Sequence, residues 1–249
     1  MTKQVCYLGD DFLDGAAIYL AGIMSHFGIS YDYVPSAESP PGDFLAQDYG
    51  LYVLSDYPAA RWPTGMLTHL AEAVRNGASL AMFGGWESYY GLLGEYHDTA
   101  LADILPVVMA KEDDRRNFAQ PCLVRCNDPN HPITAGLPWH SPPCIGGLNV
   151  FRPKTNATQL LSAVRCSVTL GEEGYVMKSE EVFPLLVVGN CMNGRTIALA
   201  TDVAPHWVGG FVDWGNDRVI EEVGDGFIDV GNWYATFFVN LLRWGLWDT

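Results

Sequence analysis

Short apolar runs alternate with helix-patterned stretches over the first third of the chain. Each run is almost continuously apolar and is closed by Gly, Pro, Ser or Asp, which is typical of a buried strand. The predicted strands are residues 5–8, 31–34, 49–54 and 79–83. Apolar residues at helical spacing predict two helices, one at residues 12–27 and one from an N-cap at Thr64 to Asn76. Strands that alternate with amphipathic helices indicate a parallel sheet with helices on both faces.

The pattern is less regular through the middle of the chain. Residues 127–138 are rich in turn formers and predict a loop, with one short helical turn beginning at His131. Short β segments follow at residues 159–163 and 167–170, and residues 171–174 predict a turn after them. We expect this region to form insertions that decorate the sheet and are antiparallel at its edge.

A hairpin and a terminal helix are predicted near the end of the chain. Strands at residues 184–189 and 195–200 flank Asn193-Gly194, a dipeptide typical of a two-residue hairpin turn. A loop rich in glycine and acids, residues 209–229, leads to a helix from about Asn232. The patterns together predict an α/β fold with a mostly parallel sheet, an antiparallel edge and loop insertions. A single domain over residues 1–249 accommodates it.

Charge and composition exclude several classes of partner. The chain has 29 acidic and 14 basic residues, and its net charge of −15 repels the phosphates of nucleic acids. The apolar stretch at residues 233–247 is interrupted by Asn240 and Arg243 and is too short to span a bilayer. Residues 1–4 run directly into the first strand and leave no room for a signal-peptide core. We therefore expect a cytoplasmic protein that binds neither nucleic acid nor membrane.

Six cysteines are scattered along the chain. Disulfide frameworks occur in short, cysteine-dense chains, so we expect these six to be reduced thiols. Cys122 and Cys126 have no second Cys or His pair at zinc-site spacing, and no metal site is assigned to them. The sequence identifies no cofactor.

Polar residues follow the ends of several predicted strands. The carboxyl ends of parallel strands meet at one edge of a sheet, which predicts a shared crevice there. The candidate ligand-binding residues are Asp10, Asp11, Asp56, Gly84, Gly85, Trp86 and Trp207, and the candidate catalytic residues are Glu87, Ser88, Asp202 and His206. Trp86, Trp207 and Trp214 either line a pocket or belong to the core, and the core is the commoner place for indoles.

Several acids in one crevice repel one another unless something compensates them. Three arrangements are open: a metal ion or basic ligand binds there, one carboxyl has a raised pKa, or the acids turn away to cap helices and bond loop amides. Asp10 and Asp11 are placed to cap the first predicted helix, and Glu87 to stabilise the N-terminus of a helix that follows it.

Three segments, residues 84–89, 131–138 and 198–207, resemble the class I glutamine-amidotransferase-like superfamily, in its uncharacterised branch related to trehalose-utilisation proteins. The resemblance implies a flavodoxin-like three-layer sandwich over nearly the whole chain. Such amidotransferases carry a nucleophilic Cys in a G-x-C-x-G turn between strand and helix, and here Trp86 stands at that position. His206 matches the place of the partner His, but no acid stands two residues after it. The resemblance therefore implies this fold without its glutaminase triad.

Two classes of function remain open from the sequence. The first is an enzyme or binding protein for a small molecule, carbohydrate-like by analogy with the relatives, in the acidic crevice. The second is a non-catalytic interaction or oligomerisation module, which predicts a homo-oligomer. Fold alone does not choose between them.

Overall fold

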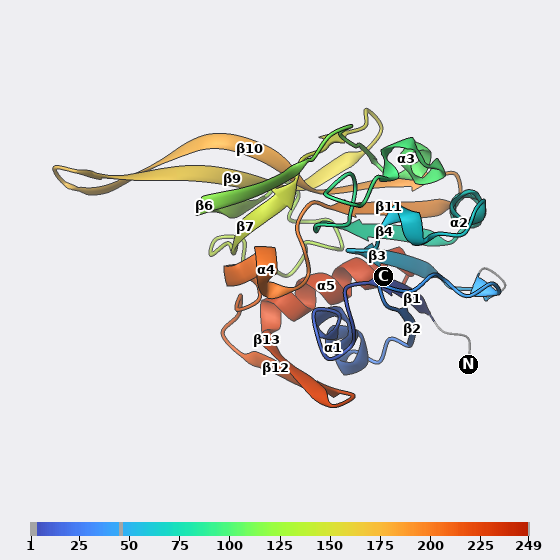
Figure 1. Ribbon diagram of the computed structural model, residues 1–249. Coiled ribbons are helices and arrows are strands. Elements are labelled where there is room, and N and C mark those ends of the chain that lie inside the picture. Colours follow the sequence, from blue (N-terminus) through green and yellow to red (C-terminus); the bar gives the residue numbers. More distant parts are fainter. Residues whose placement is uncertain (1–3, 45–46, 249) are drawn as a thin grey trace.

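The computed structural model describes residues 4–44 and 47–248. Residues 1–3, 45–46 and 249 of the predicted 1–249 domain lie outside that part. The described residues include one mixed sheet of nine strands, with five neighbouring parallel strands on one side and four antiparallel strands on the other (Figure 1). The fold is the predicted α/β flavodoxin-like three-layer sandwich. Its antiparallel part is larger than the edge that the sequence indicated.

The parallel half contains the strands that the sequence predicts most clearly. In sheet order its members are β2 (Tyr31–Val34), β1 (Val5–Gly9), β3 (Leu51–Ser55), β4 (Ser79–Phe83) and β11 (Gly194–Leu199). Every residue of β1, β3 and β4 is buried. Burial on both faces explains why these strands appear in the sequence as continuous apolar runs.

The helices begin and end close to, but not always at, their predicted residues. They are α1 (Ile18–His26), α2 (Met66–Arg75), α3 (Ala100–Ile104), α4 (Pro205–Val208) and α5 (Asn232–Gly245), with short 3₁₀ turns at Ala59–Arg61, Tyr96–Asp98 and Gly209–Phe211. In Figure 1, α1 and α5 lie together below the sheet and α3 lies above it. Helix α5 packs on β4, where the Phe83 and Phe238 rings meet edge to face at 5.8 Å.

Two helix starts differ from the prediction. Helix α1 begins at Ile18 rather than Phe12, because residues 12–17 form turns in which the Gly15 amide donates to the Phe12 carbonyl at 2.9 Å. The Phe12 side chain is exposed, so it does not continue the apolar stripe of the helix. The N-cap of α2 is Gly65 at φ 81° and not Thr64. Glycine adopts this left-handed conformation without the steric penalty of a side chain.

The antiparallel half was only partly predicted. It consists of β10 (Gly174–Cys191), β9 (Thr158–Gly171), β6 (Arg115–Cys126) and β7 (Cys144–Asn149), in that order. The two β segments predicted at residues 159–163 and 167–170 are one continuous strand, β9. Arg165, predicted to lie between them, pairs with Glu181 on β10 at 2.8 Å. The turn predicted at residues 171–174 joins β9 to β10, whereas β6 and β7 were not predicted at all.

Two further turns correct the sequence reading. In the β10–β11 hairpin Cys191 pairs with Gly194, so the turn residues are Met192 and Asn193 rather than Asn193 and Gly194. The loop predicted at residues 209–229 contains the hairpin of β12 (Arg218–Val223) and β13 (Gly226–Gly231). A short pair, β5 (Val107–Val108) with β8 (Arg152–Pro153), completes the strands.

Some remaining expectations can be compared with the described residues directly. All six cysteines are free thiols and are buried or half-buried. At His131 the expected helical turn is a hydrogen-bonded turn, since the Ala135 amide donates to the His131 carbonyl at 2.9 Å. None of the described helices is long and apolar enough to cross a membrane.

Candidate functional site

A pocket of about 350 Å³ lies at the carboxyl ends of the parallel strands. Seven of the eleven candidate residues line it: Asp10, Asp11, Asp56, Trp86, Glu87, Asp202 and His206. These residues follow β1, β3, β4 and β11, as expected if parallel strands deliver their loops to one edge. The tertiary structure thus brings together side chains that are up to 196 residues apart, from Asp10 to His206.

Asp10 and Asp56 occupy equivalent positions on neighbouring strands. Gly9 at the end of β1 pairs with Ser55 at the end of β3, and the Asp10 amide donates to the Ser55 carbonyl at 2.8 Å. Both aspartates are in the left-handed region, with φ values of 50° and 47°. Such conformations are uncommon for residues other than glycine and cluster at functional sites. A shared unusual backbone therefore presents two carboxyl groups side by side at the edge of the sheet.

Asp10 is held by two tyrosines that the sequence did not single out. The Tyr7 hydroxyl donates to Asp10 Oδ2, and the Tyr33 hydroxyl donates to the Asp10 carbonyl at 3.2 Å. Burial raises the pKa of the Asp10 carboxyl to about 7, although the Tyr7 hydrogen bond favours the ionised form. Asp10 therefore stays protonated to a higher pH than an ordinary aspartate.

Asp56 connects β3 to the loop after β4. Its Oδ1 accepts the Glu87 amide at 2.7 Å, and its own amide donates to Ser88 Oγ at 3.1 Å. A Cβ on Gly85 would lie 2.0 Å from Asp56 Oδ1, so only glycine fits beside this carboxyl. The pKa of Asp56 is raised to about 8, mainly by burial and secondly by the charge of Asp10.

Asp202, which follows β11, is the third buried carboxyl beside Asp10 and Asp56. Its Oδ1 accepts the amides of Val203 at 2.6 Å and Ala204 at 3.0 Å, which confirms the expected bonding to loop amides. Burial raises its pKa well above the usual range, and the charges of Asp10 and Asp56 add to the effect. Three neighbouring carboxyls therefore have raised pKa values, and a protonated carboxyl can both donate and accept hydrogen bonds or act as a general acid.

Helix capping and metal binding were the other ways proposed to compensate these acids. Helix α1 begins eight residues after Asp10 and has no side-chain cap, so the capping role predicted for Asp10 and Asp11 is wrong. The first helical turn after Glu87 starts at Tyr96, which places Glu87 outside any helix N-terminus. Among the described residues, no group of three or more His, Cys, Asp and Glu side chains is arranged to hold a metal ion.

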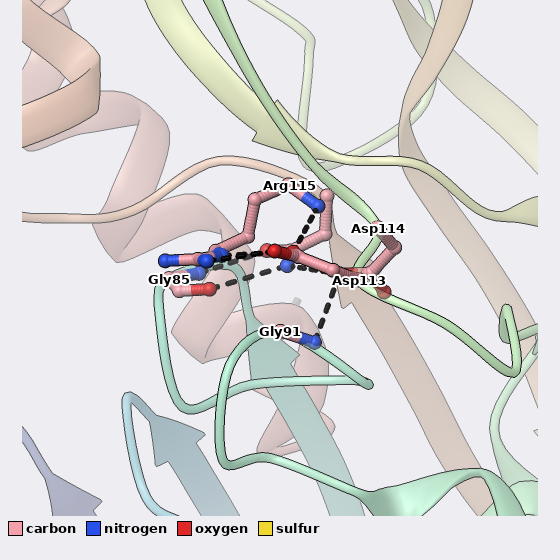
Figure 2. Close-up of polar contacts among 6 residues, drawn as sticks. Gly85, Gly91, Asp113, Asp114 and Arg115 are labelled. Atoms are coloured by element: carbon pink, nitrogen blue, oxygen red, sulfur yellow. Dashed lines mark hydrogen bonds and ion pairs between the residues drawn. The ribbon is translucent and has the colours of Figure 1, made fainter.

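The mouth of the pocket carries an aromatic and cationic stack. The Arg115 guanidinium lies over the Trp86 ring, 4.5 Å from its centroid, and the His206 ring meets the same indole at 5.8 Å. Arg115 is itself paired with Asp113 at 2.7 Å (Figure 2). Trp86 is 42% exposed, so the expectation that it belongs to the core is wrong, whereas Trp207 and Trp214 are buried as expected.

Asp114 and Asn149 hold the loop that carries Trp86. Asp114 Oδ1 accepts the Gly91 amide at 2.9 Å (Figure 2). It also accepts the Asn149 side-chain amide at 2.8 Å. Asn149 also accepts the Gly85 amide at 2.9 Å and donates to the Gly85 carbonyl at 3.1 Å. Both ends of the loop are thereby tied to the antiparallel half. Sequence reasoning missed Asp114 and Asn149 because it did not predict the strands beside them.

Four candidate residues do not line the pocket. Ser88 is buried beneath it, and Trp207 donates from its indole to Asn117 Oδ1 at 2.8 Å. Gly84 packs against the Ala200 carbonyl, and Gly85 lies behind Asp56. Conversely, Ser36, Leu92 and Leu93 line the pocket without having been predicted. Ser36 follows the strand predicted at residues 31–34, so the rule applied to Asp10 would have found it.

The strand–turn–helix elbow of amidotransferases is not formed after β4. Residues 84–95 are irregular, and Trp86 does not have the positive φ that Tyr89 and Glu95 have. No cysteine is among the described residues that line the pocket. The position that would carry an activated thiolate thus lacks both the sulfur and the local backbone that activates it.

Comparison with known proteins agrees with this fold. The family model GATase1_like, described as "Putative glutamine amidotransferase", matches residues 54–223. Two cytoplasmic proteins from Salmonella typhimurium have similar structures. One is 24% identical with a TM-score of 0.74 over 96% of this chain and 98% of its own, and the other is 22% identical with a TM-score of 0.73 over 97% and 98%. A ThuA-like protein from Parabacteroides merdae is 14% identical, with a TM-score of 0.59 over 99% and 90%. No curated protein matches the chain by sequence.

Proposed function

We propose that this chain, which belongs to the glutamine amidotransferase-like family GATase1_like, binds a small, hydroxyl-rich, carbohydrate-like molecule in its pocket instead of hydrolysing glutamine, because no cysteine is among the described residues that line the pocket. The observation that carries the proposal is an exposed indole, Trp86, at the mouth of a pocket that Asp10, Asp56 and Asp202 line.

This combination matches the two kinds of surface that a sugar presents. The C–H face of a sugar ring is apolar and packs on an aromatic face, while its hydroxyl groups donate and accept hydrogen bonds. Carboxyls of raised pKa suit a neutral ligand, because a protonated carboxyl can do both without leaving a buried charge unpaired. A pocket of about 350 Å³ lies at the small end of the range for ligand sites, which favours a mono- or disaccharide.

Calorimetric titration with a panel of monosaccharides, disaccharides and polyols tests the proposal. We expect at least one to bind, and Trp86→Ala to weaken its affinity by about tenfold or more. Phe227→Ala is the matched control, since Phe227 is an exposed aromatic on β13 outside the pocket and its removal should leave affinity unchanged. Absence of binding by the whole panel, or equal losses in the two variants, would refute the proposal.

The second function class, assembly of copies through a non-catalytic module, has its own support. Several large apolar side chains are exposed next to one another on β9 and β10, including Leu170, Tyr175 and Met177. We place both in the cytoplasm, where thiols stay reduced, since all six cysteines are free. We expect neither a membrane partner nor a nucleic-acid partner, and the net charge of −15 repels the phosphates of nucleic acids.

A further inference from the structure

The hairpin of β9 and β10 extends beyond every neighbouring strand. Strand β6 pairs with β9 only as far as Arg165, and β11 pairs with β10 only from Leu186 onward. Residues 166–179, which we call the arm, therefore form a two-stranded ribbon that projects from the body (Figure 1). Six residues of β9 beyond Arg165 correspond to about 20 Å of extension.

The arm leaves the body at the same edge of the sheet as the pocket. Leu186 of β10 pairs with Leu199, the last residue of β11, and β10 runs antiparallel to β11. The residues that precede Leu186 in β10 must then continue past the carboxyl end of β11. The pocket lies at that same end, since Asp202 and His206 follow β11.

One face of the arm is apolar at its exposed positions except at Ser179, which pairs with Cys166. Leu170 pairs with Tyr175 and Val168 with Met177, and residues that pair directly share a face of the ribbon. Val182, which lies just outside the arm and beyond an irregularity in the register, pairs with Val164 and continues the same face. The exposed apolar residues of this face are each between 48% and 83% exposed, namely Val168, Leu170, Tyr175, Met177 and Val182. On the opposite face, Ser167 pairs with Lys178 and Thr169 with Val176.

The exposed apolar face of this ribbon is expected to pack against a partner. An isolated two-stranded hairpin is marginally stable in water, and contiguous apolar side chains on a surface mark an interaction site. We propose that the apolar face of the arm binds a second copy of this chain, lying across the mouth of its pocket.

The area available on the arm argues for contact with the body of the second copy. A ribbon about 20 Å long and about 10 Å wide covers on the order of 200 Å², whereas a stable interface buries about 800 Å² on each partner. Two arms packed only on each other fall short of that. Further exposed apolar side chains stand at the carboxyl edge of the sheet: Trp86, Leu92 and Leu93 line the pocket, and Phe12 follows β1.

The shared edge makes this contact reciprocal. Two copies that face each other across a two-fold axis each extend an arm toward the pocket edge of the other, which gives two equal contacts and a closed dimer. Net charges of −15 repel one another, while the exposed apolar face of the arm carries no charge. Association should therefore strengthen as salt screens the repulsion, whereas binding to a basic partner would weaken.

Sedimentation velocity over a wide concentration range tests the association without any ligand. The wild type should form dimers that tighten in high salt. The double variant Leu170→Asp/Tyr175→Asp should weaken dimerisation by about a hundredfold or more, because it places charges in an apolar contact. Val176→Asp is the matched control on the opposite face of the arm and should dimerise like the wild type. Both variants change exposed side chains, and circular dichroism checks that each retains its fold.

The site of contact is tested by a photo-crosslinking amino acid at Met177, which lies on the apolar face. We expect crosslinks between chains, with the attached peptide containing Phe12 or residues 86–93. A monomeric wild type, equal disruption by Val176→Asp, or crosslinks to any other surface would overturn the proposal. Because no sugar is present in either experiment, failure of the ligand proposal would leave both results unaffected.

Discussion

The two halves of the sheet differ in how much of each strand is buried. In the parallel half, β1, β3 and β4 are buried at every residue. In the antiparallel half, the first nine residues of β10 after Gly174 include none that is buried, and the last four residues of β9 are exposed. The parallel half is therefore the core of the molecule. The antiparallel half is partly a surface structure, and its stability depends less on burial.

The pocket lies where the halves meet, and each contributes a different kind of residue. The carboxyl groups of Asp10, Asp56 and Asp202 follow parallel strands. Asp114 and Asn149, which tie down the Trp86 loop, precede β6 and end β7 in the antiparallel half. The parallel strands thus present the titrating carboxyl groups, and the antiparallel half holds the loop that carries Trp86.

Truncation of one leucine in each half of the sheet should give the largest difference in the free energy of unfolding. Leu8→Ala removes a fully buried side chain from β1 and should lower the free energy of unfolding by about 2–5 kcal/mol, because a cavity forms. Leu170→Ala on the exposed arm should change it by no more than about 0.5 kcal/mol. Urea unfolding at protein concentrations low enough to avoid association measures both. Similar losses would contradict the division into core and surface halves.

The junction between the halves should be the next most sensitive place. Asn149→Ala leaves the Gly85 amide without its side-chain acceptor and removes one of the donors to Asp114, and it should cost about 1–3 kcal/mol of unfolding free energy. It should also increase hydrogen exchange of the amides in residues 85–91. Arg116→Ala, at an exposed position close by on β6, is the control and should do neither. Unchanged exchange in Asn149→Ala would show that other contacts hold the loop.

The raised pKa values of the buried carboxyls predict that the free energy of unfolding falls as pH rises. An ordinary Asp has a pKa of 3.8, while those of Asp10 and Asp56 are raised to about 7 and about 8. Between pH 4 and 8 the folded state therefore holds protons that the unfolded chain has released, and its stability decreases with increasing pH.

Thermal unfolding at pH 5 and pH 8 measures this dependence. The melting temperature of the wild type should be lower at pH 8. Asp56→Asn keeps an oxygen to accept the Glu87 amide but cannot ionise, so its melting temperature should change less between the two pH values. A variant with the same pH dependence as the wild type would place the titration elsewhere.

The smallest expected effect concerns the cysteines. We expect no thiol chemistry in either half of the sheet. Burial raises the pKa of the Cys6 thiol in β1, and it raises that of Cys122 in β6 to about 11, so neither is a reactive thiolate at neutral pH. Thiol-directed glutamine analogues should not label the protein stoichiometrically, and no glutamine should be hydrolysed. Mass spectrometry and an ammonia-release assay check the two outcomes. Stoichiometric labelling at Cys6 or Cys191 together with glutamine turnover would reverse the conclusion.

The sequence by itself determined the parallel half and the edge at which the acids meet. Strands buried on both faces need continuous apolar runs, and those runs are visible without any partner strand. Once the strands are parallel, their carboxyl ends share an edge, which is why Asp10, Asp56 and Asp202 could be grouped from the sequence. The same rule would have included Ser36.

Only the tertiary structure decided the remainder. Strands with one or both faces exposed, such as β6 and the outer part of β10, have mixed patterns that resemble loops, because contacts distant in the sequence stabilise them. The hydrogen bonds from Asn149 to Gly85 and Asp114 join three separate segments, and no local pattern records them. The raised pKa values likewise depend on burial and on the proximity of the three carboxyls, which arise only when β1, β3 and β11 lie in one sheet. Local periodicity is fixed by the order of residues, whereas long-range pairing and desolvation exist only in the folded chain.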